Sequence, residues 1–317
     1  MRRAAALLAL PLAALPTAAC SGEGATVTGE APAPGSAYVA IGDSYTAAPG
    51  IGASLDDACG RSAGNYPSLV AAALDLELTD VSCSGALTVH VSDPQYVGDQ
   101  VRAPQGDALG AGTDLVTVSL GANDDGVFGG LLGCVPQAAA DPTGSPCRDH
   151  YLGADLDGAD LDGADLDGAG QDGLAPGGVT PAEGAVDRLR VRLAGRVAAA
   201  VGAVQRRAPR ARVLVVGYPV IAPTETCPQF PLATGDVAFV AEVNAVLNDA
   251  LAAGAAERGA DFVDLTAPTE GHDLCSADPW VAGQTPTGPA TPYHPYVEEQ
   301  QAAAAAIVAA LSVPEGG

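Results

Sequence analysis

Short, unbroken aliphatic runs recur at wide intervals along the chain, and they form its clearest structural pattern. Apolar and polar residues do not alternate within these runs, which is typical of strands buried on both faces of a parallel sheet. Five segments, most of them continuous runs of this kind, predict strands. They cover residues 38–41, 78–82, 115–120, 213–217 and 262–265.

Alanine-rich segments with helical spacing lie between the aliphatic runs. The predicted helices cover residues 66–74, 186–207, 237–258 and 296–311. Strands that alternate with helices over this length favour one α/β domain in three layers, with helices on both faces of a doubly wound parallel sheet of about five strands. We expect this domain to span residues 37–313 and to bind ligands beyond the carboxyl ends of its strands.

The segment 153–173 breaks the pattern, because Gly-Ala-Asp-Leu-Asp occurs there three times in succession. Three copies are too few to bury a core by stacking as a solenoid. A calcium loop of the EF-hand type is excluded by spacing, since Asp160 stands where that loop needs glycine. With seven acidic residues and no basic one, the segment is best explained as an acidic surface insertion.

The net charge of −24 argues against nucleic acids and anionic membrane surfaces as partners. A neutral substrate fits such a field better than one that carries several phosphates or carboxylates. All 14 basic residues are arginine. A Walker phosphate-binding loop, which requires lysine, is therefore excluded.

The first residues read as an export signal. Arg2 and Arg3 precede a short apolar stretch, and small residues precede Cys20. We therefore expect residues 1–19 to be a signal peptide and residues 20–36 to be a flexible tether. The segment before Cys20 resembles a bacterial lipobox, which would make the protein a cell-surface lipoprotein. Thr17 stands where leucine is usual, so free secretion stays open.

Six further cysteines support export, because an even number in an exported chain implies disulfides. They are Cys59, Cys83, Cys134, Cys147, Cys227 and Cys275. Pairing of sequential neighbours would be simplest, but the sequence alone does not choose among the possible pairings. A zinc site is disfavoured, since no Cys-x-x-Cys motif occurs and no histidine lies at ligand spacing from a cysteine pair. We expect no metal.

Distinctive polar residues follow three of the predicted strands. They are Ser44 after Gly42-Asp43, Gly85 within Ser82-Cys83-Ser84-Gly85-Ala86, and Asn123 within Gly121-Ala122-Asn123-Asp124. Because the carboxyl ends of parallel strands meet at one edge, these groups are expected to converge. A serine nucleophile needs a base and donors for an oxyanion. His294 can be the base, and the N–H groups of Ser44 and Gly85 with the Asn123 amide can be the donors.

The chain resembles the SGNH or GDSL hydrolases, whose block residues Ser, Gly, Asn and His match Ser44, Gly85, Asn123 and His294 in order and spacing. Finer features resemble the secreted lipase and esterase branch of bacteria. These are Arg61-Ser62 and Tyr66-Pro67 after Cys59, Gly217-Tyr218-Pro219, and Gly271-His272 with Cys275 and Pro279-Trp280. The resemblance implies a flavodoxin-like sheet and three disulfides in sequential order, Cys59–Cys83, Cys134–Cys147 and Cys227–Cys275.

One position departs from the family pattern. Many members have aspartate three residues before the catalytic histidine, and here that position is Thr291. Some relatives use a main-chain carbonyl to orient the histidine instead, so we predict that the carbonyl of Thr291 accepts from the His294 ring. Asp43 is expected to brace its loop, and His272 is the only rival base. Asn123 has a simpler alternative role, as a helix cap.

Together these features predict an exported serine ester hydrolase, a lipase or esterase, that acts on small neutral carboxylic esters through an acyl-enzyme. No cofactor is expected, and the protein is expected to be a monomer, with membrane attachment only through a lipidated Cys20. Two alternatives remain open. One is a carbohydrate acetylesterase of the cell envelope, and the other is a non-catalytic surface lipoprotein on the same fold.

Overall fold

A five-stranded parallel sheet forms the centre of the computed structural model, which describes residues 31–153 and 181–312. Its strands, in chain order, are β1 (Ala37–Gly42), β4 (Glu77–Asp80), β7 (Leu115–Ser119), β8 (Arg212–Val216) and β9 (Asp261–Val263). All five lie within two residues of the predicted bounds at their start and end. The spatial order is β4-β1-β7-β8-β9, so the direction of winding reverses between β1 and β7.

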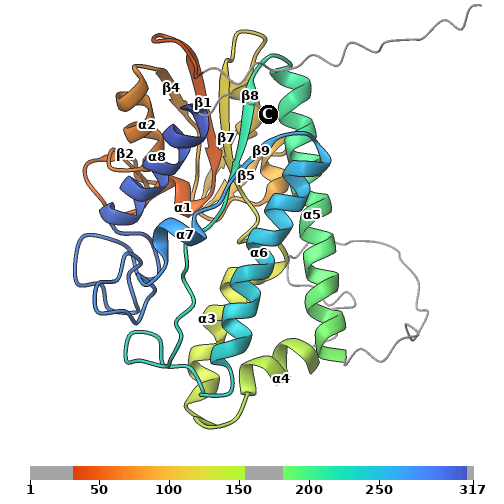
Figure 1. The fold of residues 1–317 in the computed structure, drawn as a ribbon, viewed down its shortest axis with the longest axis vertical. Coiled ribbons are helices and arrows are strands. Elements are labelled where there is room, and N and C mark those ends of the chain that lie inside the picture. Colours follow the sequence, from red (N-terminus) through yellow and green to blue (C-terminus); the bar gives the residue numbers. More distant parts are fainter. Residues whose placement is uncertain (1–30, 154–180, 313–317) are drawn as a thin grey trace, which may run out of the picture.

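Helices cover both faces of the sheet, as Figure 1 shows. On one face, α2 (Tyr66–Leu74) and α8 (Val297–Ser312) pack on Tyr38, Leu115 and Leu214. On the other, α5 (Pro181–Arg207) and α6 (Val237–Glu257) pack on the alternate side chains of the same strands. The predicted doubly wound, three-layer α/β/α fold is therefore confirmed.

The helix α6 is long and apolar enough to cross a membrane by length and composition alone. Its Val240, Leu247 and Leu251 side chains are nevertheless buried against the sheet and α5. The position of α6 is that of a core helix in a globular domain.

The sequence pattern did not predict two helices, α3 (Val127–Ala138) and α4 (Pro146–Gly153). Glycine and proline occur in α3, and α4 is largely polar, so neither shows a clean apolar period. The remaining elements are short. They are the hairpins β2 (Ser54–Asp56) with β3 (Arg61–Ser62) and β5 (Gln95–Val97) with β6 (Gln100–Arg102), the turns η1 (Thr88–Val91), η2 (Gln105–Ala108) and η3 (Asp124–Gly126), and the helices α1 (Ser44–Ala47) and α7 (Thr266–Thr269).

Three disulfides pair sequential cysteines: Cys59 with Cys83, Cys134 with Cys147, and Cys227 with Cys275. The pairing implied by the family resemblance is therefore confirmed. The six cysteines that a zinc site would have used are all in these bonds. The acidic insertion, apart from its first residue, the signal peptide and Cys20 lie outside the described residues.

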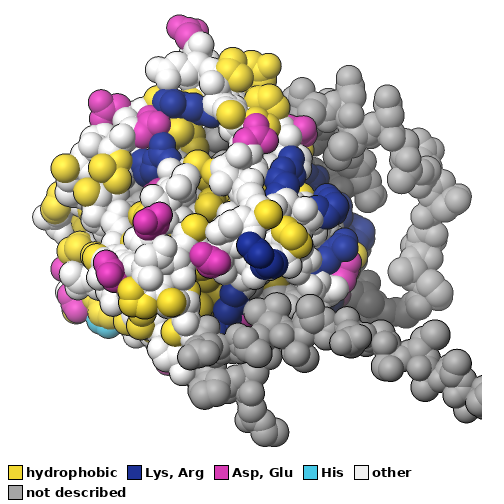
Figure 2. All heavy atoms as spheres, turned by 90° about the horizontal axis from the view of Figure 1, so that it is seen from above, with side chains coloured by type: hydrophobic (Ala, Val, Ile, Leu, Met, Phe, Trp, Pro, Cys, Tyr) yellow, Lys and Arg dark blue, Asp and Glu magenta, His cyan; other side chains and the backbone are white. Residues whose placement is uncertain are grey.

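The charge is unevenly distributed despite the strongly acidic composition. Figure 2, which views the amino edge of the sheet, shows arginine side chains gathered on the side of the molecule that α5 occupies. Of the arginines in α5, Arg196 pairs with Asp125 at 2.7 Å and Arg190 with Asp187 at 3.3 Å. The net charge therefore does not describe every face of the molecule.

Candidate active site

Ser44 lies at the carboxyl end of β1, where the strand turns sharply into α1. A Cβ at Gly42 would overlap the Thr46 side chain, so this turn requires glycine. The buried Gln105 side chain holds Gly42 by accepting from its N–H at 2.9 Å and donating to its carbonyl at 3.0 Å. Ser44 is thereby presented as the first residue of α1, with 8% of its surface exposed.

Asp43, directly before Ser44, is the centre of a buried polar cluster. Its carboxylate accepts from the Tyr218 hydroxyl at 2.6 Å and from the Tyr45 N–H at 2.9 Å. Burial raises the pKa of Asp43 to about 7, against these two bonds, which lower it. The Tyr218 hydroxyl also accepts from the Ala122 N–H at 3.2 Å, so it ties the ends of β1, β7 and β8 together. These contacts agree with the expected bracing role of Asp43.

Asn123 reaches the same edge from the end of β7. Its side chain makes no cap bond to the turn that follows it, so the simpler role as a helix cap is wrong. The amide nitrogen instead donates to the Ala86 carbonyl at 3.1 Å and, at 3.4 Å, to Asp43. Asp124 fixes the same region, because its carboxylate accepts from the N–H and hydroxyl of Thr88 at 2.9 and 2.5 Å.

Gly85 follows β4 in residues 82–86, which we name the Gly85 loop. Its φ of +74° lies in the left-handed region, and this angle, more than lack of space, demands glycine. The residue is exposed. In the part of the chain that the structure describes, its N–H donates to no protein acceptor. The N–H of Ser44 has no acceptor within α1 either, because it opens that helix.

His294 lies in residues 282–295, the histidine loop, just before α8. Its Nδ1 bonds the carbonyl of Pro292 at 2.8 Å, so the predicted use of the Thr291 carbonyl is wrong by one residue. Tyr293 has a φ of +64°, which turns the chain tightly enough to bring the carbonyl two residues back against the ring. The Thr291 carbonyl is occupied, since it accepts from the His294 N–H at 3.1 Å.

Aromatic rings surround the His294 imidazole. The rings of Tyr45 and Phe128 have centroids 5.8 and 6.0 Å from it. Tyr45, the neighbour of Ser44, also donates from its hydroxyl to the Tyr293 carbonyl at 2.9 Å. Burial lowers the pKa of His294, although its bond to Pro292 acts in the opposite direction. The ring is therefore kept neutral, with Nδ1–H toward Pro292 and Nε2 as a proton acceptor.

The structure brings Ser44 and His294 to neighbouring positions without joining them directly. Within residues 31–153 and 181–312, no hydrogen bond links the Ser44 hydroxyl to the His294 ring. Within the same ranges, no carboxylate bonds or pairs with that ring. The two residues are connected through Tyr45, which belongs to the helix that begins at Ser44 and bonds the histidine loop.

Comparison with known proteins identifies the architecture. Residues 40–302 match the GDSL-like lipase/acylhydrolase family. The chain belongs to this family. It is 36% identical to Lipase 2 of Streptomyces coelicolor over 76% of this chain and 73% of that one, and 30% identical to Lipase 1 of the same organism over 86% and 87%.

Two solved structures of Streptomyces enzymes have the same fold. Phospholipase A1 from Streptomyces albidoflavus superposes with a TM-score of 0.62 at 26% identity, and the extracellular lipase from Streptomyces rimosus with 0.59 at 25%. Each superposition covers 87% of this chain and 99% of the other. The family prediction is confirmed, and the chain is a carboxylic ester hydrolase, a lipase or esterase.

An apolar pocket lies beside the site of this GDSL-family enzyme, between α3, α6 and the histidine loop. Ala122, Phe128 and Tyr293 line its side nearest the site, and Val243 and Leu247 of α6 form the opposite wall. Its volume is about 30 Å³, room for about two water molecules. An acyl chain would enter it only after side chains in the wall had moved apart.

The rival base His272 is held in a different arrangement. Its ring stacks on Trp280 with centroids 3.7 Å apart, and its Nδ1 contacts the Asp278 carbonyl at 2.7 Å. Trp280 in turn bonds Tyr296 through its carbonyl at 2.8 Å. The stacked His272 and Trp280 side chains therefore support the chain around Tyr296, which leads into α8.

Three residues of the site escaped sequence reasoning. Gln105 lies 63 residues from Gly42, and no local pattern links the two. Tyr218 belongs to a matched Gly-Tyr-Pro motif, which marked the residue without revealing its partner Asp43. Tyr45 could be noticed only as the neighbour of Ser44, because its bond to Tyr293 spans almost the whole chain.

Proposed function

We propose that Ser44 is the nucleophile and His294 the general base of a serine ester hydrolase. The observation that carries this assignment is the His294 ring, whose Nδ1 is committed to Pro292 while the ring packs on the residue next to Ser44. Such a ring keeps Nε2 free to accept the serine proton. The hydrolase needs no carboxylate in the third position, because a main-chain carbonyl orients the base.

The reaction follows from these roles. The Ser44 oxygen attacks the ester carbonyl carbon while its proton passes to Nε2 of His294. The tetrahedral intermediate collapses as His294 returns that proton to the departing alcohol, which leaves an acyl-serine. Water, deprotonated by the same histidine, then attacks the acyl group and releases the acid and free Ser44. The Pro292 carbonyl supports the imidazolium that forms in each half of the cycle.

Three donors would hold the oxyanion: the N–H groups of Ser44 and Gly85, and the side-chain amide of Asn123. Neither N–H is spent on a protein acceptor in the described region, which supports their assignment. The Asn123 amide uses one donor on Ala86 at 3.1 Å and the other in the longer 3.4 Å contact with Asp43. We infer that the longer contact is exchanged for the oxyanion.

The substrate class follows from the pocket and the charge. The apolar lining between α3 and α6 suits a neutral acyl chain, and the net charge of −24 disfavours anionic esters. We therefore infer a small neutral carboxylic ester with an aliphatic acyl group. The apolar lining favours this class over acetylated carbohydrate, which would leave the pocket unused.

The direct test is hydrolysis of a series of nitrophenyl esters from acetate to decanoate. We expect turnover by the mature protein, a loss of about 10⁴-fold or more in Ser44→Ala, and no change in the matched exposed variant Ser312→Ala. Val243→Phe should narrow the pocket and reduce the ratio of decanoate to acetate turnover. Residual wild-type turnover in Ser44→Ala would refute the nucleophile assignment.

We also propose that the protein is exported, with residues 1–19 removed, Cys20 lipidated and residues 20–36 serving as tether to a monomeric domain. Three disulfides suit an exported protein, and one structural relative is an extracellular lipase. Metabolic labelling with a palmitate analogue should mark the wild type and not Cys20→Ala. Absence of label from both proteins would favour free secretion, and equal labelling of both would show that the lipid is attached at a residue other than Cys20.

A further inference from the structure

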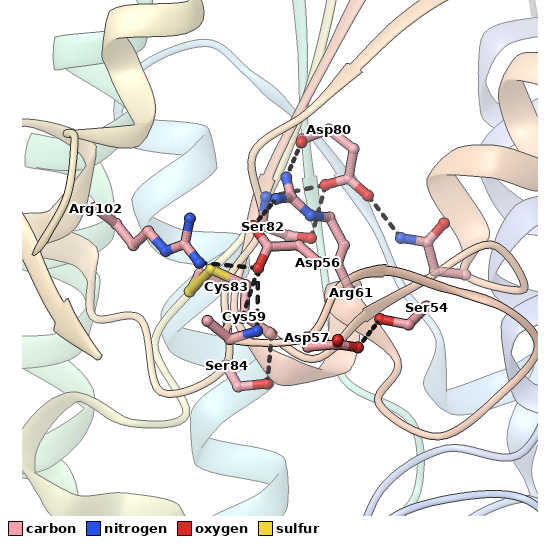
Figure 3. A network of polar contacts seen from close by, with 12 residues as sticks. Ser54, Asp56, Asp57, Cys59, Arg61, Asp80, Ser82, Cys83, Ser84 and Arg102 are labelled. Carbon is pink, nitrogen blue, oxygen red and sulfur yellow. Dashed lines mark hydrogen bonds and ion pairs between the residues drawn. A yellow bond between two sulfur atoms is a disulfide. The ribbon is translucent and has the colours of Figure 1, made fainter. Parts of the chain in front are cut away.

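A closed ring of polar contacts surrounds the Cys59–Cys83 disulfide, next to the Gly85 loop. Figure 3 shows four of its members, Asp56, Cys59, Ser84 and Arg102. The members come from the two small hairpins and from the chain that follows β4. The ring runs from Asp56 to Cys59 and Ser84. It returns through Gln95 and Arg102 to Asp56.

Asp56 is the most connected member. One carboxylate oxygen accepts from the N–H groups of Ala58 and Cys59 at 3.1 and 3.2 Å and from Arg102 at 2.9 Å. The other accepts from Arg61 at 2.9 Å. Burial alone would raise the pKa of Asp56, but the Cys59 N–H and the two guanidinium groups together hold it below its usual value. The carboxylate is therefore ionised at neutral pH.

Cys59 links Asp56 to the Gly85 loop through hydrogen bonds at its N–H and its carbonyl. Asp56 holds its N–H, while its carbonyl accepts from both the N–H and the hydroxyl of Ser84 at 2.9 Å. The disulfide adds a covalent link to Cys83. Ser84 directly precedes Gly85, so the plane of the peptide that carries the Gly85 N–H is set by these contacts.

The second hairpin closes the ring from the other side. Gln95 of β5 donates to the Ser84 carbonyl at 2.8 Å, and that carbonyl belongs to the same peptide group as the Gly85 N–H. Gln95 is paired in register with Arg102 of β6, which bonds Asp56. The peptide group between Ser84 and Gly85 is thus held at its carbonyl by Gln95. On its N-terminal side it is held by the two bonds of Ser84 to the Cys59 carbonyl.

We propose that Asp56 is a positioning residue that aims the Gly85 N–H at the oxyanion. The proposal rests on the function proposed above, in which Gly85 is a donor. Asp56 does not touch the reacting atoms; it acts through Cys59, Ser84 and Arg102. Because an oxyanion donor works only in a narrow geometry, release of the ring lowers turnover more than substrate binding.

The experiment compares Asp56→Ala and the milder Asp56→Asn with the matched control Asp57→Ala. Asp57 is the next residue, and its side chain bonds Ser54 on the same hairpin instead of the ring. For each variant, kcat and KM are measured for one nitrophenyl ester, with the active fraction counted by phosphonate titration. Affinity for a trifluoromethyl ketone reports the oxyanion site, and hydrogen exchange of residues 82–87 reports the loop.

We expect Asp56→Ala to lower kcat about tenfold while KM stays within about twofold of the wild type. Affinity for the trifluoromethyl ketone should also fall about tenfold. Exchange of the Gly85 loop should be faster, Asp56→Asn should be intermediate, and Asp57→Ala should match the wild type. If Asp56→Ala folds too poorly to assay, Asp56→Asn decides the same comparison.

Equal loop exchange and equal kcat in the Asp56 variants and the control would overturn the proposal. A loss confined to stability, with an unchanged kcat for each titrated active site, would also overturn it. If the wild type proved as inert as Ser44→Ala, the proposed function would fail by itself, and the exchange data would still show whether Asp56 orders the Gly85 loop.

Discussion

The end of β1 and the histidine loop meet at the same edge of the sheet but are held by different kinds of contact. Around Ser44, the fully buried side chains of Asp43 and Tyr218 bond one another and three strand ends. Around His294, the bonds come from main-chain groups. The Pro292 carbonyl orients the ring, and Ala282, at the start of the loop, donates to the His294 carbonyl at 2.9 Å and accepts from the Tyr293 N–H at 3.0 Å. Tyr45 is the side chain that joins the two regions.

With the roles proposed for Ser44 and His294, the difference explains how a hydrolase could lack the third member of a triad and keep an oriented base. A carboxylate orients histidine by charge and needs one residue in one place. A main-chain carbonyl supplies the same hydrogen bond from the shape of the loop, so many side chains share the task. Apart from replacement of Ser44 or His294 themselves, substitutions should consequently be severe at the end of β1, moderate at Tyr45 and mild within the histidine loop.

Among substitutions that leave Ser44 and His294 in place, Tyr218→Phe should have the largest effect, because it removes the hydroxyl that serves both Asp43 and the Ala122 N–H. We expect a loss of about 2–3 kcal/mol in stability and about tenfold in kcat. Urea unfolding and ester kinetics measure the two losses. The matched variant Tyr38→Phe removes a buried bond to Thr117 on the other face of the sheet and should cost stability only. If kcat fell equally in Tyr218→Phe and Tyr38→Phe, the Asp43 cluster would have no particular role in catalysis.

Glu299→Gln tests the buried first turn of α8. There the Gln300 side-chain amide donates to Glu299 and, at 2.9 Å, to the Tyr45 carbonyl. Burial raises the pKa of Glu299 to about 8 from an ordinary value near 4.5, although the Gln300 amide lowers it. Its stabilising contribution is therefore complete below about pH 4.5 and is lost as pH rises toward 8. The variant should match the wild-type melting temperature near pH 4.5 and exceed it by about 5 °C near pH 8.

Calorimetric scans across that pH range decide the point. The titration of Asp43 occurs in both proteins and cancels in the difference. A difference in melting temperature between the wild type and Glu299→Gln that stayed constant from about pH 4.5 to 8 would mean that Glu299 is ionised over this whole range.

Tyr45→Phe tests the bridge, since it deletes the hydroxyl bond to Tyr293 and keeps the ring beside His294. We expect about 1 kcal/mol in the barrier, or several-fold in kcat, with little change in KM. Tyr66→Phe, which loses a hydroxyl contact to Thr46, is the matched control and should leave kcat unchanged. The bridge would be dispensable if Tyr45→Phe behaved like its control.

Pro292→Ala and Thr291→Val should have the smallest effects, because both leave the main-chain carbonyls in place. We expect kcat within about threefold of the wild type in each, whereas neutralising the carboxylate of a triad costs about 10⁴-fold. Steady-state kinetics of the two variants settle this. A collapse of the size expected for His294→Ala would show that a side chain of the loop, and not its backbone, orients the base.

The fold and the meeting of three candidate site residues at one edge of the sheet were predictable for one reason. Strands such as β1 and β7 are buried on both faces, so their apolar runs are visible in the sequence, and the topology of a parallel sheet brings Ser44, Gly85 and Asn123 to one edge. The glycine- and proline-bearing α3 has no comparable pattern. Long-range partners such as Gln105 and Gly42 depend on the finished fold and leave no local signal.

The error at Thr291 has a similar origin. The departure from the family pattern correctly indicated that a main-chain carbonyl would serve His294. Which carbonyl does so depends on the left-handed φ of Tyr293, a conformation that a tyrosine seldom adopts and that no sequence pattern announces. Loop geometry of this kind is set by bonds to Ala282, at the other end of the loop, and to Tyr45, which lies 248 residues from Tyr293.

The most direct test of the account is covalent labelling with a fluorophosphonate, followed by peptide mapping and a pH profile of the labelling rate. We predict one adduct, on Ser44. The labelling rate should stay constant down to a pH below 6.5, since burial lowers the pKa of His294. His294→Ala should slow labelling by about 10³-fold or more. An adduct on another residue, or wild-type labelling in His294→Ala, would contradict the account.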